Sequence, residues 1–288
     1  MQPIYYKSSS LYKGDYRFEL FDNRHEFNHQ PHFHDFYEIQ FYEECRASMS
    51  IGDSEYMVNS GDIVFLRAFQ PHGLHIWKSH SNYKRYCFSL NSSFLLNLCT
   101  GDLNPLNMFS ENASYFPILK LADEKFQDFL KLFKQYYAIE DSHAKKLHQR
   151  SVVLEIIAKL YDITYDLADH TSEELDKTVL ISEIVTYISE HLKENLTLDT
   201  ISEEVGYSKY YLCRMFKKYT NTTIIQYINM KRIDFSKYLL STTTQSLQEI
   251  SQSAGFNNYS CFYKTFFATT GQSPKDYRKE SAKKETTR

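Results

Sequence analysis

Short runs of aromatic and β-branched residues alternate with turn-forming residues between Phe18 and Phe88. The clearest runs are 36–42, 48–51, 55–58 and 63–66. Gly52-Asp53 and Gly61-Asp62 interrupt them, and both pairs are typical of turns. Strands this short and this closely spaced predict a small antiparallel barrel or sandwich.

The period of the apolar residues changes to that of a helix between 123 and 169. One apolar stripe consists of Phe126, Phe129, Leu130, Phe133 and Tyr137, and a second consists of Val153, Ile156, Ile157, Leu160 and Tyr161. Two such helices need a surface to pack on, which is either the barrel or the same helices of a second subunit. We expect a homodimer through these helices, because the stripes are too extensive to stay in water.

The chain has a helical pattern from Thr178 onward, and this part contains an internal repeat. A shift of 50 residues superposes Leu212 on Phe262, Phe216 on Phe266, Thr220 on Thr270 and Tyr227 on Tyr277. A shift of 49 residues superposes Leu198 on Leu247, Ile201 on Ile250 and Gly206 on Gly255. Two copies of one supersecondary unit are therefore predicted, which is too few for a solenoid.

Each copy has the pattern of a helix, a turn with glycine and a second helix. In the first copy, Leu198, Ile201 and Val205 mark the apolar face of the first helix. Gly206 can adopt the left-handed conformation of a tight turn, and Ser208 is a suitable N-cap for the second helix. This is the pattern of a helix-turn-helix, whose second helix enters the major groove of DNA.

The outer faces of the two second helices supply the candidate DNA-binding residues. They are Ser208, Lys209, Tyr210, Cys213, Arg214 and Lys217 in the first copy, and Asn258, Tyr259, Ser260, Tyr263 and Lys264 in the second. Arg214 is the best candidate for a bidentate contact with guanine. Lys217 is a candidate for a phosphate contact. Asn257 or Asn258 is expected to cap the second of these helices.

The stretch from Thr223 to Leu240 joins the two copies without glycine or proline. As one helix, its 18 residues extend about 27 Å. Successive major-groove turns on one face of DNA lie roughly 34 Å apart. A single chain could therefore read two adjacent segments of the groove.

The charge distribution supports a polyanionic partner for the second half of the chain. Residues 178–288 carry 15 Lys and Arg against 11 Asp and Glu, whereas residues 1–177 carry 18 against 25. The five cysteines are scattered without a Cys-x-x-Cys pair, which indicates reduced thiols. No signal sequence opens the chain, and no apolar run approaches the roughly 20 residues of a membrane span. We expect a soluble, cytoplasmic protein with no membrane partner.

Residues 181–279 resemble the DNA-binding domain of the AraC/XylS family of transcription regulators. The matching patterns are Leu198-x2-Ile201-x3-Val205-Gly206-Tyr207-Ser208, Leu212-x-Arg214-x-Phe216-Lys217, Ile250-x3-Ala254-Gly255-Phe256-x5-Phe262-x3-Phe266 and Gly271-x-Ser273-Pro274-x-x-Tyr277-Arg278. The resemblance implies seven helices, two helix-turn-helix units and a regulatory role, with activation as the usual outcome and RNA polymerase as a candidate partner. Cys213 departs from the family, which often has a longer polar side chain there.

The segments 31–34, 61–62 and 71–72, together with Glu38, are similar to the sensor domain of many family members, a cupin-like β-barrel. The resemblance implies a pocket for a small-molecule effector. Because side chains alternate along a strand, His32, His34 and Glu38 share one face. The candidate effector-binding residues are His32, His34, Tyr37, Glu38, His72, His75 and Trp77. Polar groups beside aromatic faces suit a sugar or a related polar metabolite.

His32, His34 and Glu38, together with His72 or His75, could instead form a metal site of three histidines and one carboxylate, as in cupin enzymes. A metal-dependent cupin enzyme with a DNA-binding domain is therefore the alternative, and the DNA-binding half argues against it. No catalytic triad, phosphate loop or zinc-finger spacing stands out elsewhere. We expect a protein that is not an enzyme and that works without a metal or other cofactor.

The sequence as a whole predicts an α+β chain of three parts. A cupin-like antiparallel barrel at 1–115 senses the effector, and a helical dimerisation region with a linker follows at 116–177. An all-α double helix-turn-helix domain at 178–288 binds double-stranded DNA. An effector that favours one arrangement of these parts over another would change the affinity for DNA.

Overall fold

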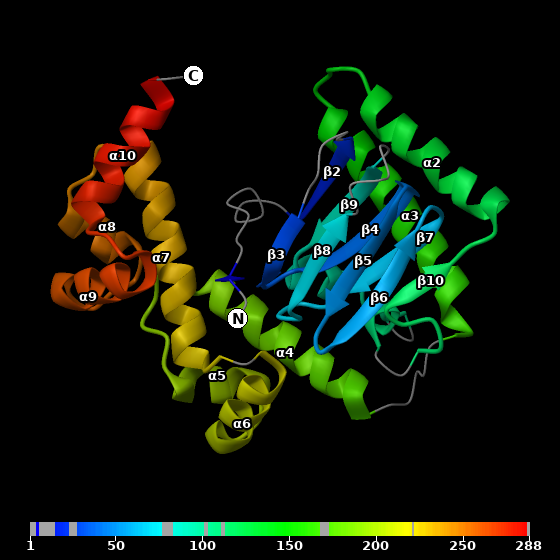
Figure 1. The fold of residues 1–288 in the computed structure, drawn as a ribbon. Helices are drawn as coiled ribbons and strands as arrows, with labels where there is room; N and C mark the ends of the chain where they lie inside the picture. Colours follow the sequence, from blue (N-terminus) through cyan, green and yellow to red (C-terminus); the bar gives the residue numbers. More distant parts are fainter. Residues whose placement is uncertain are drawn as a thin grey trace. The chain divides into compact units, whose positions relative to one another are not determined.

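The computed structural model describes residues 4–5, 15–22, 28–76, 83–100, 103–110, 113–167, 173–220 and 222–286 (Figure 1). The chain divides into two compact units, Met1–Val179 and Leu180–Arg288. The first unit combines strands with helices, and the second is helical within the described residues. The predicted α+β class is confirmed.

Two five-stranded sheets form the centre of the first unit. One has the order β1 (Ile4–Tyr5), β3 (Asn28–Phe33), β8 (His72–Ile76), β5 (Arg46–Ile51) and β6 (Ser54–Asn59). The other has the order β10 (Ile118–Lys120), β7 (Asp62–Leu66), β4 (Tyr37–Glu44), β9 (Lys84–Leu90) and β2 (Tyr16–Asp22). Strand pairs are antiparallel apart from β1 with β3.

Strand β4 is the central strand of the second sheet, and both of its faces are buried. Alternation along the strand sends Ile39 and Phe41 to a core that includes helical residues. Tyr42 faces the other way, into an apolar cluster that takes residues from both sheets. The space between the two sheets is therefore a filled interior.

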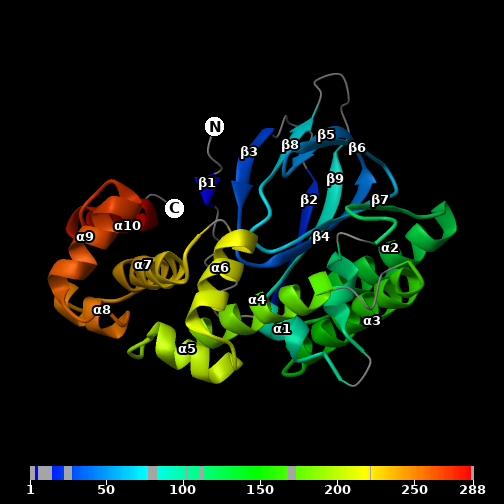
Figure 2. The ribbon, with the colours of Figure 1, turned by 90° about the horizontal axis from the view of Figure 1, so that it is seen from below.

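Helices α2 (Asp123–Ala138) and α3 (Lys145–Tyr165) cover the outer face of the second sheet (Figure 2). The rings of Phe41 and Phe133 meet edge to face with centroids 4.8 Å apart. Short helices α1 (Ser92–Leu96) and η2 (Pro105–Phe109) join the same core. The apolar stripes of these helices thus pack on the sheet, one of the two surfaces that the sequence allowed.

The second unit is built from the end of α4 and six further helices. Their bounds are α4 (Glu173–Glu190), α5 (Leu198–Val205), α6 (Lys209–Thr220), α7 (Ile224–Thr242), α8 (Leu247–Ser253), α9 (Tyr259–Thr270) and α10 (Pro274–Thr286). The pairs α5–α6 and α8–α9 are the two predicted copies, and α7 joins them. In the described part of the chain, no helix is long and apolar enough to cross a membrane.

Helix α7 forms the core of the second unit. Thr223 and Gln226 form a capping box at its start, so the helix begins where the sequence predicted. Its 19 residues extend about 28 Å, and ten of them are buried. One of these is Arg232, which donates hydrogen bonds to the carbonyl oxygens of Leu192 at 3.2 Å and Glu194 at 2.8 Å.

The turn of the second copy lies against the same arginine. Gly255 has a φ of +84°, in the left-handed region that favours glycine. A Cβ atom there would lie 2.5 Å from the Leu192 carbonyl oxygen and 3.0 Å from Arg232 Nε. Gly206, the equivalent residue of the first copy, has a φ of +73° with no atom within 4 Å of such a Cβ. Gly255 is thus required both for its conformation and for space.

Replacing each glycine with alanine separates these two requirements. Gly206→Ala should cost roughly 1–2 kcal/mol, because only the left-handed conformation is penalised. Gly255→Ala should cost more, because the Leu192 carbonyl and the Arg232 guanidinium must also move. We expect amide hydrogen exchange in α8 and α9 to rise well above the level that Gly206→Ala produces in α5 and α6. Equal effects of the two substitutions would contradict the close packing.

Candidate functional site

The first helix-turn-helix has the local structure that its sequence predicts. Gly206 ends α5 in the left-handed conformation, and its N–H donates to the Ser202 carbonyl. The Ser208 hydroxyl accepts a hydrogen bond from the Tyr211 N–H at 3.4 Å, so Ser208 acts as the N-cap of α6. Lys209 Nζ lies 2.7 Å from Asp199 Oδ1 and ties the start of α6 to α5.

Helix α6 has one buried and one exposed face. Leu212, Met215 and Phe216 are buried. Arg214 and Lys217 are exposed, and the Tyr210 side chain is 77% exposed. Cys213 is half-buried between the two faces. The structure therefore places the polar candidates on the side of α6 that is open to a partner.

The second helix-turn-helix begins with a capping box of Ser246 and Glu249. Of the two asparagines before α9, Asn258 is the cap, and its Oδ1 accepts a hydrogen bond from the Cys261 N–H at 2.8 Å. The sequence proposed Asn258 as a DNA contact. Its oxygen already accepts a hydrogen bond at the helix end, so the two N–H donors of the amide nitrogen are the groups most available for such a contact.

The exposed face of α9 is mainly aromatic. Tyr259, Tyr263 and Phe267 are 37%, 40% and 51% exposed. The rings of Tyr263 and Phe267 are nearly parallel, with centroids 6.5 Å apart. Ser260 and Lys264 lie on the same exposed surface. Sequence reasoning missed Phe267, although its position four residues after Tyr263 predicts it. Apolar groups of this kind can contact thymine methyl groups.

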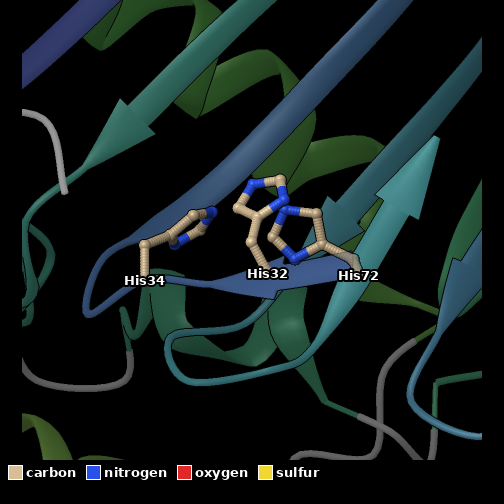
Figure 3. Close-up of side chains that lie close together, drawn as sticks. All are labelled: His32, His34 and His72. Atoms are coloured by element: carbon tan, nitrogen blue, oxygen red, sulfur yellow. The ribbon is translucent and has the colours of Figure 1, made fainter. Parts of the chain in front are cut away.

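A second polar site lies at one end of the first unit, where three histidines meet (Figure 3). His32 on β3 pairs directly with His72 on β8, and His34 follows β3. One ring nitrogen from each lies within 4.8 Å of the others. Glu38 enters from β4 in the other sheet. Its Oε2 lies 3.4 Å from His34 Nε2 and 3.7 Å from His72 Nε2.

The backbone holds two of these rings in a defined orientation. His34 Nδ1 lies 2.9 Å from the Phe36 carbonyl oxygen, and His72 Nδ1 lies 2.9 Å from the Gln70 carbonyl oxygen. A carbonyl accepts only, so each Nδ1 carries the proton. The Nε2 atom of each ring therefore faces Glu38, and in the neutral form of the ring it is an acceptor.

Glu38 is held by neighbours within the interior. Its Oε2 accepts from Gln40 Nε2 at 2.8 Å, and its Oε1 accepts from Cys87 Sγ at 3.1 Å. Gln40 Oε1 in turn accepts from buried Arg85 at 2.9 Å and from the Tyr42 hydroxyl. This network orients the carboxylate in a space that is otherwise apolar.

The surroundings shift the pKa values of this site. Burial alone would raise the pKa of Glu38, but His34, His72 and Arg85 outweigh burial and hold it well below the usual range. Burial, together with neighbouring His34, lowers the pKa of His72 to about 3. Near neutral pH the site thus contains an ionised carboxylate and a neutral His72.

The structure corrects two of the predicted effector-binding residues, and a third cannot be placed. Tyr37 lies on the opposite face of β4 from Glu38 and packs on Phe109, with ring centroids 4.7 Å apart. Adjacent residues of a strand cannot share a face. His75 is exposed, because Leu74 and Ile76 take the inward positions of β8. Trp77 lies outside the described residues.

Sequence reasoning also missed Gln40, Arg85 and Cys87. Gln40 is two residues after Glu38 and could have been found by alternation along the strand. Arg85 and Cys87 join the site because β9 pairs with β4, with Cys87 opposite Gln40 and Arg85 opposite Tyr42. That pairing has no local signal in the sequence.

Two family profiles match the chain. The AraC-like ligand binding domain matches residues 16–162, about half of the chain, and a helix-turn-helix domain matches residues 201–280. The crystal structure of apo ToxT from Vibrio cholerae is 17% identical and has a TM-score of 0.54, covering 92% of this chain and 97% of that one. That likeness shows a shared fold.

The curated relatives match only part of this chain. The melibiose operon regulatory protein of Escherichia coli K12 is 35% identical over 107 residues, which is 37% of this chain and only 35% of that protein. The regulatory protein SoxS of the same strain is 31% identical over 99 residues, 34% of this chain and 92% of SoxS. The Msm operon regulatory protein of Streptococcus mutans is 28% identical over 168 residues, 52% of this chain and 60% of that protein.

The two profiles occur in the order of the two structural units. The ligand-binding profile covers the two sheets apart from β1, together with α2 and most of α3, and the helix-turn-helix profile covers both copies of the repeat from the middle of α5 onward. The chain belongs to the AraC family.

Proposed function

We propose that this chain is a transcription regulator that binds specific double-stranded DNA through α6 and α9. The observation that carries the proposal is the pair of helix-turn-helix units, each of which leaves the outer face of its second helix exposed. Such a helix places side chains near its start against base edges. The protein is then not an enzyme, and we expect it to act in the cytoplasm.

Helix α7 supports a site that spans two groove segments. Its length of about 28 Å is close to the roughly 34 Å that separates major-groove turns on one face of DNA. The two reading helices differ in chemistry. Arg214 and Lys217 give α6 a cationic face, whereas Tyr263 and Phe267 give α9 an aromatic one. We therefore expect base discrimination by hydrogen bonds at one segment and by apolar contacts at the other.

We further propose that a small polar effector, a sugar or a related metabolite, binds in the first unit and changes the affinity for DNA. Two relatives carry the names of the melibiose and Msm operons, and melibiose is a sugar. A ToxT structure contains an unsaturated fatty acid, but the likeness to ToxT concerns only the fold. Glu38, Gln40 and Arg85 offer hydrogen-bonding groups that suit a polar ligand better. Activation, through contact with RNA polymerase, is the expected direction.

Substitutions of Arg214 and Lys217 test whether α6 contacts the bases and the phosphates of DNA. Arg214→Ala should lose about 1–3 kcal/mol for the cognate duplex and should relax base preference at one position. Lys217→Ala should weaken all duplexes evenly and reduce the salt slope by about one unit, because one phosphate contact is lost. Titrations of cognate and scrambled duplexes at several salt concentrations separate the two effects.

Lys131→Ala provides the matched control, since Lys131 is an exposed lysine on α2 in the other unit. It should leave both the affinity and the salt slope unchanged. An Arg214→Ala variant that is folded and keeps its full preference for the cognate duplex would show that α6 is not the reading helix.

We still propose a homodimer, but through exposed residues rather than through the apolar stripes of the two helices. Apart from Tyr137, the stripes that suggested it are covered by the sheet, so they no longer supply an extensive dimer surface. Tyr137 and Leu147, at the adjoining ends of α2 and α3, are 47% and 69% exposed, and Tyr165 at the far end of α3 is 43% exposed. These are the apolar candidates on the described residues of the two helices. We expect a dimer in sedimentation at micromolar concentration, and Leu147→Glu should shift it toward monomer. A monomer both with and without effector would contradict the proposal.

A further inference from the structure

The cluster of His32, His34, His72 and Glu38 contains acceptors that nothing in the described structure satisfies. His34 Nε2 and His72 Nε2 are buried, and neither has a hydrogen-bond partner among the described residues. Both lie within 4 Å of the same carboxylate oxygen, Glu38 Oε2. A buried polar atom without a partner costs roughly 1–3 kcal/mol. Two such atoms aimed at one point indicate a missing positive group.

The hydrogen bonds around the cluster show which kind of group fits. Each Nδ1 donates to a backbone carbonyl, so Nε2 is the ring atom that faces the carboxylate, and the neutral form of each ring presents its lone pair there. Lone pairs and a carboxylate repel one another unless a cation lies between them. Gln40 and Cys87 already occupy other positions around Glu38, which leaves the side facing the histidines open.

We propose that His32, His34, Glu38 and His72 bind a divalent first-row transition-metal ion. Imidazole and carboxylate together are ligands that such ions prefer. Bonds of 2.0–2.2 Å place adjacent ligand atoms of a tetrahedral site about 3.4 Å apart. Oε2 of Glu38 lies 3.4 and 3.7 Å from two of the nitrogens. The three ring nitrogens lie within 4.8 Å of one another, so they would approach by up to about 1.4 Å when an ion binds.

The neighbours of the cluster match what metal ligands require. Histidine ligands are usually oriented by a carbonyl that accepts from the second ring nitrogen, and carboxylate ligands are themselves hydrogen-bonded. The carbonyls of Phe36 and Gln70 provide the first feature, and Gln40 provides the second. His32 is only half-buried, which gives an ion a path from solvent. The sequence alone predicted a metal-free barrel, because it does not contain these orientations.

Cobalt(II) is the probe that tests the proposal. The full chain, freed of metal with a chelator, should bind one equivalent of Co²⁺ with visible d–d absorption of a nitrogen and oxygen site, and Zn²⁺ should displace it. His34→Ala and His72→Ala should abolish this absorption. His75→Ala is the matched control, because His75 shares strand β8 with His72 but is exposed. It should bind like the unsubstituted chain.

A positioning variant makes the test independent of the ligands themselves. Gln40→Met should weaken Co²⁺ binding about 10–100-fold while leaving the stoichiometry at one, because Gln40 orients Glu38 without being a ligand. Circular dichroism of each variant without metal shows whether it folds. For a variant that fails to fold, X-ray absorption of the unsubstituted zinc-loaded chain decides instead, with only nitrogen and oxygen neighbours at about 2.0–2.2 Å expected.

Several results would overturn the inference. They are the absence of stoichiometric binding by the folded, unsubstituted chain, unchanged binding by folded His34→Ala, equal loss in His75→Ala, and sulfur in the zinc coordination shell. None of them bears on whether α6 and α9 read DNA, so the metal site and the proposed reading of DNA stand or fail separately.

Discussion

The arrangement of the second unit depends on a buried guanidinium. Arg232 is buried in the interior of a helical unit. The desolvation of its charge is tolerated because two carbonyl oxygens beyond the end of α4 accept its hydrogen bonds. Its charge also lies 5.8 Å from the centre of the Phe256 ring. One side chain thus connects α7, the end of α4 and the turn of the second helix-turn-helix. Gly255 is the residue that lets these three segments approach.

The first unit depends on the alternation of one central strand. Because β4 is buried on both faces, Ile39 and Phe41 hold α2 and α3 to the sheet while Glu38 and Gln40 face the interior. The same strand therefore joins the apolar core to the polar site. Burial removes competing water from Glu38, and this strengthens its interaction with the Arg85 guanidinium. A substitution that shifted β4 by one residue would exchange the two faces completely.

Local sequence signals were sufficient to predict the helices of the second unit, but they were insufficient to predict the polar site of the first unit. The repeat, the glycine turns and the caps at Thr223 and Ser208 all lie close together in sequence, so the helices and their exposed faces could be predicted. The polar site depends on the register of β3 with β8 and of β4 with β9, which brings together residues far apart in the chain. That is why Arg85 was missed and His72 could not be separated from His75. Tyr37 was an avoidable error, since it is adjacent to Glu38.

The central claim is that one chain reads two adjacent segments of DNA. Selection of duplexes from a random pool by the full chain, followed by sequencing, tests it most directly. The account predicts enrichment of two short conserved segments whose centres lie about one helical turn apart, 10–10.5 base pairs. A pool with no enriched sequence, or with a single segment unaffected by any change of spacing, would contradict it.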